Sequence, residues 1–279
     1  MSTFKEDVST DMRHISLNVA FELKKHWKKK RLPIVMLLAL VLPLIFYAVP
    51  PMLDVEYADT ANGFASTNLG FISLLIVISA AMFTGDIVCS EFENRTGLLL
   101  FPTPQRQNSI FVGKYIAALL STWMAVAIYY LITMLGMAQI YGMGDIDIEF
   151  VKSFLLALIY SASAVSIIYF FSALMKRSIT STLVGFFSLM MIMPIITTVL
   201  SVGNVDPWFL VTHSADLIGD VLGSSSGGFG PGQVGDGGPA FGGASFSPDF
   251  YVGIAVMMAY AIGFFVAGLV IANRKKMEG

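Results

Sequence analysis

Long apolar runs without charge alternate with short charged segments along the chain. In a lipid bilayer only helices and closed barrels satisfy their backbone groups, and these runs do not alternate as barrel strands do. Each run is at least as long as the roughly 20 residues that a helix needs to cross about 30 Å of hydrocarbon. The pattern therefore predicts an all-α membrane protein with six transmembrane helices, at about residues 32–53, 66–88, 111–136, 153–175, 179–202 and 250–272.

Composition agrees with this class. The chain has 279 residues, of which 56% are hydrophobic and 13% charged, whereas a soluble protein has about 25% charged residues. The N-terminus is polar up to Lys30 and lacks the apolar core of a signal peptide, so the first run is expected to remain as a span. We expect residues 1–279 to form a single transmembrane domain.

Basic residues are concentrated in alternate connecting segments. Of the 17 Lys and Arg residues, all except Lys152 precede span 1, lie between spans 2 and 3 or at the start of span 3, join spans 4 and 5, or follow span 6. Lys and Arg near span ends are retained on the cytoplasmic side. Both termini and the segment 88–110 are therefore predicted to be cytoplasmic, and the segment 203–249 external, in a multi-pass protein of the cell (plasma) membrane.

Two of these segments have further patterns. Residues 1–31 include apolar positions at helical spacing among lysines, which favours an interfacial amphipathic helix at the inner leaflet, with a solvated basic arm as the alternative. These positions are Met12, Ile15, Val19, Leu23 and Trp27. The external segment is glycine-rich at 223–243, as expected of a flexible linker, and residues 206–222 are apolar enough for a helix against the outer interface.

The chemistry of an enzyme or an ion carrier is absent from the sequence. The predicted spans contain ionisable residues only near their ends, which counts against an ion-coupled carrier. The three histidines are scattered and Cys89 is the single cysteine, so no metal site and no disulfide is predicted. The phosphate loop of nucleotide-binding proteins is also missing, because Gly113-Lys114 lacks the upstream glycine and is followed by Tyr115. If ATP drives this protein, another chain must bind it.

The segment between spans 2 and 3 contains the stretch "SEFENRTGLLLFPTPQRQ", residues 90–107. The run from Asp86 to Asn94 can continue the second span as a helix, and Thr96-Gly97 is a suitable helix end. Pro102 and Pro104 then break a short apolar piece. The segment is expected to form a rigid charged elbow, with an ordinary cytoplasmic loop as the alternative. Lys114 is expected to extend its amine to the interface at the start of the next span.

This stretch resembles the cytoplasmic segment that follows the second span in ATP-binding-cassette type-2 permeases. The resemblance is carried by Glu91, Glu93, Thr96-Gly97, the leucines 98–100, Pro102, Pro104, Arg106 and Gly113-Lys114. Three more features agree with it: the helix before span 1, the basic turn "MKRS" between spans 4 and 5, and the apolar segment before span 6. The resemblance covers nearly the whole chain.

The resemblance implies a membrane permease subunit of an ATP-driven transporter, and transport in the export direction. It implies that the stretch is a coupling segment that docks on a separate cytoplasmic ATPase, which binds ATP and Mg, so that this chain binds no cofactor and is not itself an enzyme. The residues implied in coupling are Glu91, Glu93, Arg95, Thr96, Gly97, Pro102, Pro104 and Arg106, with Lys176 and Arg177 as an additional contact.

The partners that follow are the ATPase, a second permease chain that completes the substrate path, and the lipid bilayer; no nucleic acid is expected. The residues alone leave one alternative open. An ATPase-independent membrane scaffold or a secondary carrier would also have apolar spans and a charged elbow.

Overall fold

The structure is a computed structural model that describes residues 2–52, 54, 56–93, 107–142, 147–223 and 246–275. Within these ranges all regular secondary structure is helical, which confirms the predicted all-α class. Six helical stretches of the described chain are long and apolar enough to cross a membrane, as predicted. They are Arg31–Met52, Ala61–Glu91, Asn108–Ile140, Ile148–Leu174, Ser178–Val202 and Phe250–Arg274.

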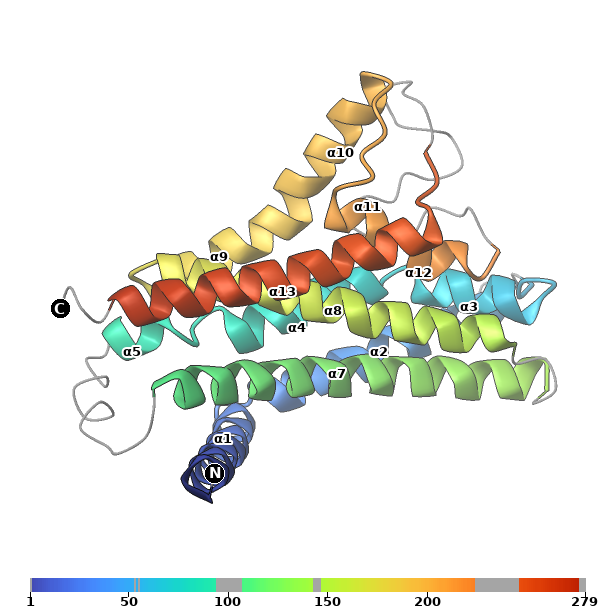
Figure 1. Cartoon of the computed structure of the whole chain (residues 1–279). Helices are drawn as coiled ribbons and strands as arrows, with labels where there is room; N and C mark the ends of the chain where they lie inside the picture. The colour runs from blue at the N-terminus through green and yellow to red at the C-terminus, as the bar shows by residue number, and fades with distance from the viewer. Residues whose placement is uncertain are drawn as a thin grey trace.

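Most of the long helices run lengthwise in one bundle, and α10 diverges from it (Figure 1). The elements are α1 (Ser2–Lys28), α2 (Arg31–Met52), α3 (Ala61–Leu69), α4 (Ile72–Thr84), α5 (Cys89–Glu93), α7 (Gln107–Ile140), α8 (Ile148–Leu174), α9 (Ser178–Phe187), η2 (Ser188–Ile192), α10 (Met193–Val202), α11 (Val211–Ala215), α12 (Leu217–Asp220) and α13 (Phe250–Lys275). The second and fifth spans are therefore each built from several helical pieces. The external segment predicted from the sequence contains the two short helices α11 and α12.

A wide π-helical turn, η2, interrupts the fifth span. Pro194 follows it and has no backbone N–H to donate, and the N–H of Met193 donates to the carbonyl of Ser188, five residues earlier. Such turns commonly form where a proline disturbs the regular pattern of α-helical hydrogen bonds. Beyond this turn α10 leaves the bundle (Figure 1), and its apolar side chains, Ile195 and Val199 among them, are exposed.

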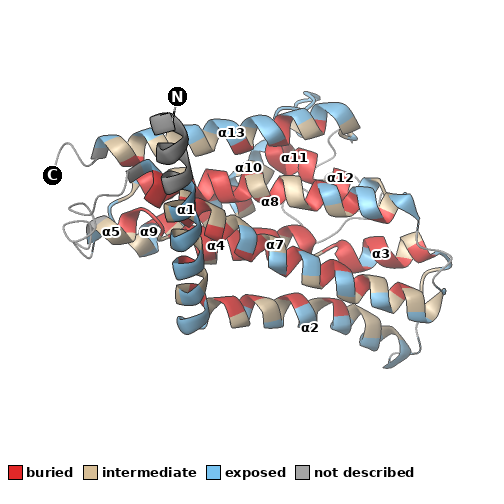
Figure 2. Ribbon diagram, turned by 60° about the horizontal axis from the view of Figure 1, so that its bottom comes forward, coloured by how far each residue is buried: buried red, intermediate tan, exposed pale blue. Residues whose placement is uncertain are grey.

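The core of the bundle lies around α8, which packs most extensively against α13 and also contacts α4, α7 and α9. Small residues allow these helices to approach closely. The Ser163 hydroxyl of α8 donates to the Met257 carbonyl of α13 at 2.7 Å, and Gly268 of α13 lies against the buried ring of Tyr169. Figure 2 shows that burial is concentrated in α4, α7 and α8 and that the outer faces of α2 and α13 are exposed.

A buried amide connects three further helices. The Asn68 side chain of α3 donates to the Pro43 carbonyl of α2 at 3.3 Å and accepts from the Thr133 hydroxyl of α7 at 3.2 Å. The Asn68 carbonyl accepts from the Tyr129 hydroxyl of α7 at 2.6 Å. Because lipid offers no hydrogen bonds, internal satisfaction of these groups fixes α2, α3 and α7 relative to one another.

The segments rich in basic residues gather toward one end of the bundle. The α1–α2 turn, α5, the start of α7, the α8–α9 turn and the end of α13 all lie there (Figure 1). The Asn273 amide of α13 donates to the Asn108 amide oxygen of α7 at 2.8 Å. We call this the basic end and define it by residues 24–31, 114, 176–177 and 274. Segments that the charge pattern assigns to one side of the membrane are therefore also neighbours in space.

We expect Gly268→Ala to destabilise the protein by about 1–3 kcal/mol through overpacking. A Cβ at Gly268 would lie 2.7 Å from Tyr169 Cδ1 and 3.3 Å from Phe170 Cα, so the two helices would have to separate. Gly263→Ala is the matched control, because a Cβ at this position of the same helix meets nothing within 4 Å. Thermal unfolding in detergent measures the difference, and equal melting temperatures for the two variants would contradict the packing described for α8 and α13.

Candidate functional site

The start of the predicted coupling segment is separated from the second span by a break. Helix α4 ends at Thr84, residues 85–88 form turns, and α5 begins at Cys89. The sequence predicted a continuous helix here. The break lies where Gly85 packs against α9, since a Cβ at Gly85 would be 2.2 Å from the Thr182 hydroxyl oxygen. Gly85 itself keeps a helical backbone, with φ −58° and ψ −29°, and its lack of a side chain lets α9 approach closely. The chain then turns over residues 85–88, and α5 contacts α8 and α9.

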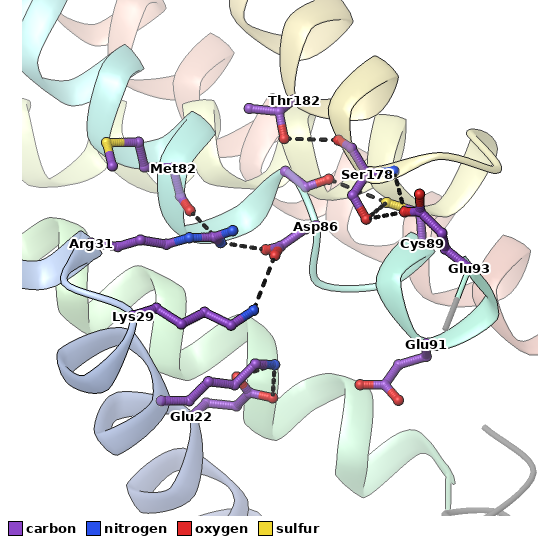
Figure 3. Close-up of polar contacts among 12 residues, drawn as sticks. Glu22, Lys29, Arg31, Met82, Asp86, Cys89, Glu91, Glu93, Ser178 and Thr182 are labelled. Atoms are coloured by element: carbon purple, nitrogen blue, oxygen red, sulfur yellow. Dashed lines mark hydrogen bonds and ion pairs between the residues drawn. The ribbon is translucent and has the colours of Figure 1, made fainter. Parts of the chain in front are cut away.

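The first of four connections holds the break to the α1–α2 turn (Figure 3). Arg31 Nη1 donates to Asp86 Oδ1 at 2.8 Å and to the Met82 carbonyl at 3.0 Å. Lys29 Nζ lies 3.9 Å from the other carboxylate oxygen of Asp86. The guanidinium group thus compensates the Asp86 charge and also satisfies a carbonyl near the end of α4.

The second connection is a buried lysine between two carboxylates. The Lys114 side chain is only 6% exposed, and its Nζ lies 3.3 Å from Glu22 Oε1 of α1 and in contact with Glu91 Oε1 of α5. Glu22 is also paired with Lys25, at 3.0 Å. The sequence predicted instead that the Lys114 amine reaches the membrane interface. Two helices cover it here, and a buried ammonium group requires acidic partners of this kind.

Gly113 explains how α1 comes close enough to cover Lys114. A Cβ at Gly113 would lie 2.8 Å from the Asn18 Cβ and 3.2 Å from the Ile15 carbonyl oxygen, both in α1. The absence of a side chain therefore allows α1 to cross α7 at this position and to bury the neighbouring Lys114.

The third connection is a carboxylate at the N-terminus of α9. Glu93 Oε2 accepts from the Ser178 hydroxyl at 2.6 Å and from the Ser178 backbone N–H at 2.9 Å. The two hydrogen bonds, that from the hydroxyl first, hold the pKa of the exposed Glu93 carboxyl below its usual range. An anionic group is favoured at this end of a helix, where N–H groups lack helical partners. Glu93 thereby joins α5 to the α8–α9 turn.

The fourth connection uses the Ser172 hydroxyl of α8. It accepts from the backbone N–H of Val88 at 3.0 Å and from that of Cys89 at 3.4 Å. The Cys89 thiol is buried next to it and lies 3.8 Å from the Ser178 hydroxyl. The start of α5 is therefore held by α8 and α9 on one side and by α1 and α7 on the other.

His26 of α1 packs beside this site as an apolar group. Its ring lies edge-on to Phe83 of α4, with 5.1 Å between centroids, and neither ring nitrogen has a hydrogen-bond partner within the described structure. Burial lowers the pKa of His26 to about 4, so the ring is neutral at physiological pH. The described residues contain no group of His, Cys, Asp and Glu that could hold a metal ion.

The predicted coupling residues divide into three groups. Glu91 and Glu93 are turned toward Lys114 and Ser178, and Lys176 and Arg177 are exposed in the α8–α9 turn. The others, Arg95, Thr96, Gly97, Pro102, Pro104 and Arg106, lie outside the described residues.

The predicted site residues did not include several that hold α5 in place, namely Glu22, Arg31, Asp86, Lys114, Ser172 and Ser178. Glu22 had a usable signal, because it is the only acid in the strongly basic stretch of residues 12–31. The two serines had none, since serines are common in packed membrane helices and look alike in a sequence.

The fold and this site define a multi-pass helical membrane protein whose second span continues into a fixed charged element at the basic end. The family model for the ABC-2 family transporter protein matches residues 18–194, from the middle of α1 to the start of α10, which is more than half of the chain. The chain belongs to the ABC-2 family of transporter proteins, and it is a membrane permease of the ABC transporter class. No curated protein matched the sequence in a search.

We expect Lys114→Met to destabilise the protein by about 3–5 kcal/mol, because it leaves buried carboxylates without their shared cation. Lys24→Met is the matched control: Lys24 is exposed and has no ion pair within the described residues, and its loss should change stability by less than about 0.5 kcal/mol. Adding Glu22→Gln and Glu91→Gln to Lys114→Met should restore part of the lost stability. Thermal unfolding in detergent tests all three variants, and a Lys114→Met protein as stable as the control would contradict the buried ion cluster.

Proposed function

We propose that this chain is the membrane-spanning permease subunit of an ATP-driven ABC transporter, and that the segment beginning with α5 receives the movement of a separate ATPase subunit. Membership of the ABC-2 family supports the first part. The second part rests on one observation, the attachment of α5 to four helices. A segment that transmits movement between two proteins needs stiff connections to the helices on which it acts.

The connections of α5 lead to different parts of the bundle. Glu91 joins it through Lys114 to α7 and, through Glu22, to α1. Glu93 and the backbone of Cys89 join it to α9 and α8. A displacement of α5 therefore acts on helices on both of its sides at once, as a coupling element requires. In this proposal Glu91 and Glu93 position the segment, and other residues contact the ATPase.

The exposed side chains next to α5 extend the proposed contact. Lys176 and Arg177 face solvent in the α8–α9 turn, and Ile179, two residues after Arg177, is 75% exposed. An apolar centre with a charged rim is typical of interfaces between proteins, and the rim favours the correct partner. Residues 94–106, with Arg95 and Arg106, supply the central part of the contact, as the resemblance of that stretch implies.

The remaining parts of the proposal follow the family. Two permease chains, a homodimer in the simplest case, enclose the substrate path in the cell membrane, with both termini in the cytoplasm and transport directed outward. Exposed apolar side chains on α2, α10 and α13, such as Leu37, Val199 and Ile262, provide surface for the second chain and for lipid. ATP and Mg are bound by the partner ATPase.

We expect the double charge reversal Arg95→Glu with Arg106→Glu to abolish association with the ATPase while the permease still inserts and folds. Reversing Glu91 or Glu93 would be less informative, because both side chains hold the fold together at α5. Lys152→Glu is the matched control, an exposed base at the start of α8 that the charge pattern assigns to the external side. The measurement is co-purification in mild detergent from the native membrane, with the ATPase identified by its phosphate-loop peptide and its stoichiometry.

Two results would count against the proposal. A wild-type chain isolated without any phosphate-loop ATPase would favour the ATPase-independent scaffold or carrier. An ATPase that binds the double reversal as tightly as the wild type would place the contact outside the segment 94–106.

A further inference from the structure

Helix α1 has two faces of different character. Its inward face, with Glu22 and His26 at the centre, packs on α7 and α4. Its outward face carries Leu17, Phe21, Lys24 and Lys28, spaced four, three and four residues apart, which places them in one stripe along a helix. All four are exposed. Over residues 12–28, the protein therefore covers one face of this helix and leaves the other exposed.

The outward face is unusually apolar for a surface in water. Leu17 is 56% exposed, Phe21 70% and Trp27 65%. Removing such side chains from water is favourable in proportion to their apolar area, and a contiguous group of them marks a contact surface. The sequence analysis predicted a different apolar face for this helix, formed by Met12, Ile15, Val19, Leu23 and Trp27. Of these five side chains, only Met12 and Trp27 are exposed, and the other three are partly covered.

The same face carries unneutralised positive charge. Three bases of this region are paired with acids inside the protein: Lys25 with Glu22, and Lys29 and Arg31 with Asp86. Three others have no ion pair within the described residues, and all are exposed: Lys24, Lys28 and Lys30. Glu22 is the only acid in residues 12–31 and is turned inward. The outward face is therefore complementary to a negatively charged surface.

The position of α1 identifies that surface. Figure 2 shows α1 crossing the long axes of α2 and α7, so that it lies in the plane of a membrane that these helices span. Lys30, with a left-handed φ of 59°, makes a tight turn into α2, which begins at Arg31. Trp27 and Lys28 therefore lie within one helical turn of the start of a span, at the level where hydrocarbon gives way to headgroups.

We propose that the outward face of α1 binds the headgroups of anionic phospholipids in the leaflet at the basic end. Lys24, Lys28 and Lys30 contact the phosphates, and the apolar side chains between them enter the acyl boundary. A basic face with aromatic and aliphatic neighbours is the usual arrangement for this kind of binding. The inference uses the position of the spans and does not depend on the partnership with an ATPase. The ATPase and a second copy of this chain are the rival occupants.

Trp27 provides the reporter for a direct test. The full-length chain with Trp123→Phe and Trp208→Phe retains Trp27 alone. It is placed in nanodiscs of one fixed mixture of phosphatidylglycerol and phosphatidylcholine, in which either the first or the second lipid carries bromine on its acyl chains. We expect brominated phosphatidylglycerol to quench Trp27 more strongly, since each lysine near an anionic surface favours that surface by about fivefold at low salt.

The controls separate lipid selection from simple proximity. Lys24→Gln with Lys28→Gln should reduce the excess quenching by phosphatidylglycerol, whereas Lys152→Gln, on α8, should leave it unchanged, and an unchanged melting temperature shows that the fold is intact. Equal quenching by the two brominated lipids would overturn the proposal, because the face would then lack headgroup selection. Quenching by neither would also overturn it and would indicate that protein or water covers this face. No ATPase is present, so failure here is distinguishable from failure of the proposed function.

Discussion

A single buried ammonium group, that of Lys114, sets the arrangement of the basic end. Placing this charge away from water is unfavourable unless carboxylates surround it, and Glu22 and Glu91 supply them from two other elements. Glu22 and Glu91 are both paired with Lys114, and Glu22 is paired with Lys25 as well. The positions of α1, α5 and α7 are therefore not independent, since moving one of them away would separate Lys114 from at least one of its carboxylates. Gly113 makes the cluster possible by allowing α1 to cross α7 closely.

The attachment of α5 to α8 and α9 consists of hydrogen bonds. Those to Ser172 join neutral groups, and those to Glu93 are exposed. These bonds respond to strain differently from the buried ion cluster. Ser172 accepts two backbone N–H groups that follow the break at Gly85, and Glu93 completes the N-terminus of α9. Exposed bonds of this kind contribute less to stability and exchange more readily with water than a buried ion cluster. The attachment of α5 to α1 and α7 is therefore the stiffer one, and its attachment to α9 is the weaker one.

The sequence predicted the fold class well because hydrocarbon demands long uncharged helices, and such runs are visible without any tertiary information. It could not predict the pairing of Glu22 with Lys114, because residues far apart in the chain meet only after α1 folds back over α7. The turns at residues 85–88 were missed for a similar reason, since the close approach of Thr182 from α9 to Gly85 is a tertiary contact. Of the predicted coupling residues, the structure assigns contacts to Glu91 and Glu93, and the roles of those between 94 and 106 remain predictions from the resemblance.

In the proposed function, the two faces of α1 limit the movements that α5 can make. A displacement of α5 that keeps Lys114 between its carboxylates must carry α1 with it. With its outward face among lipid headgroups, α1 resists movement along the membrane normal, because that would take Phe21 into water or Lys24 into hydrocarbon. Movement within the membrane plane exposes neither. In the proposed function, the ion cluster and the proposed lipid-facing stripe together therefore favour a lateral movement of α1 and α5 over a piston movement along the span axes.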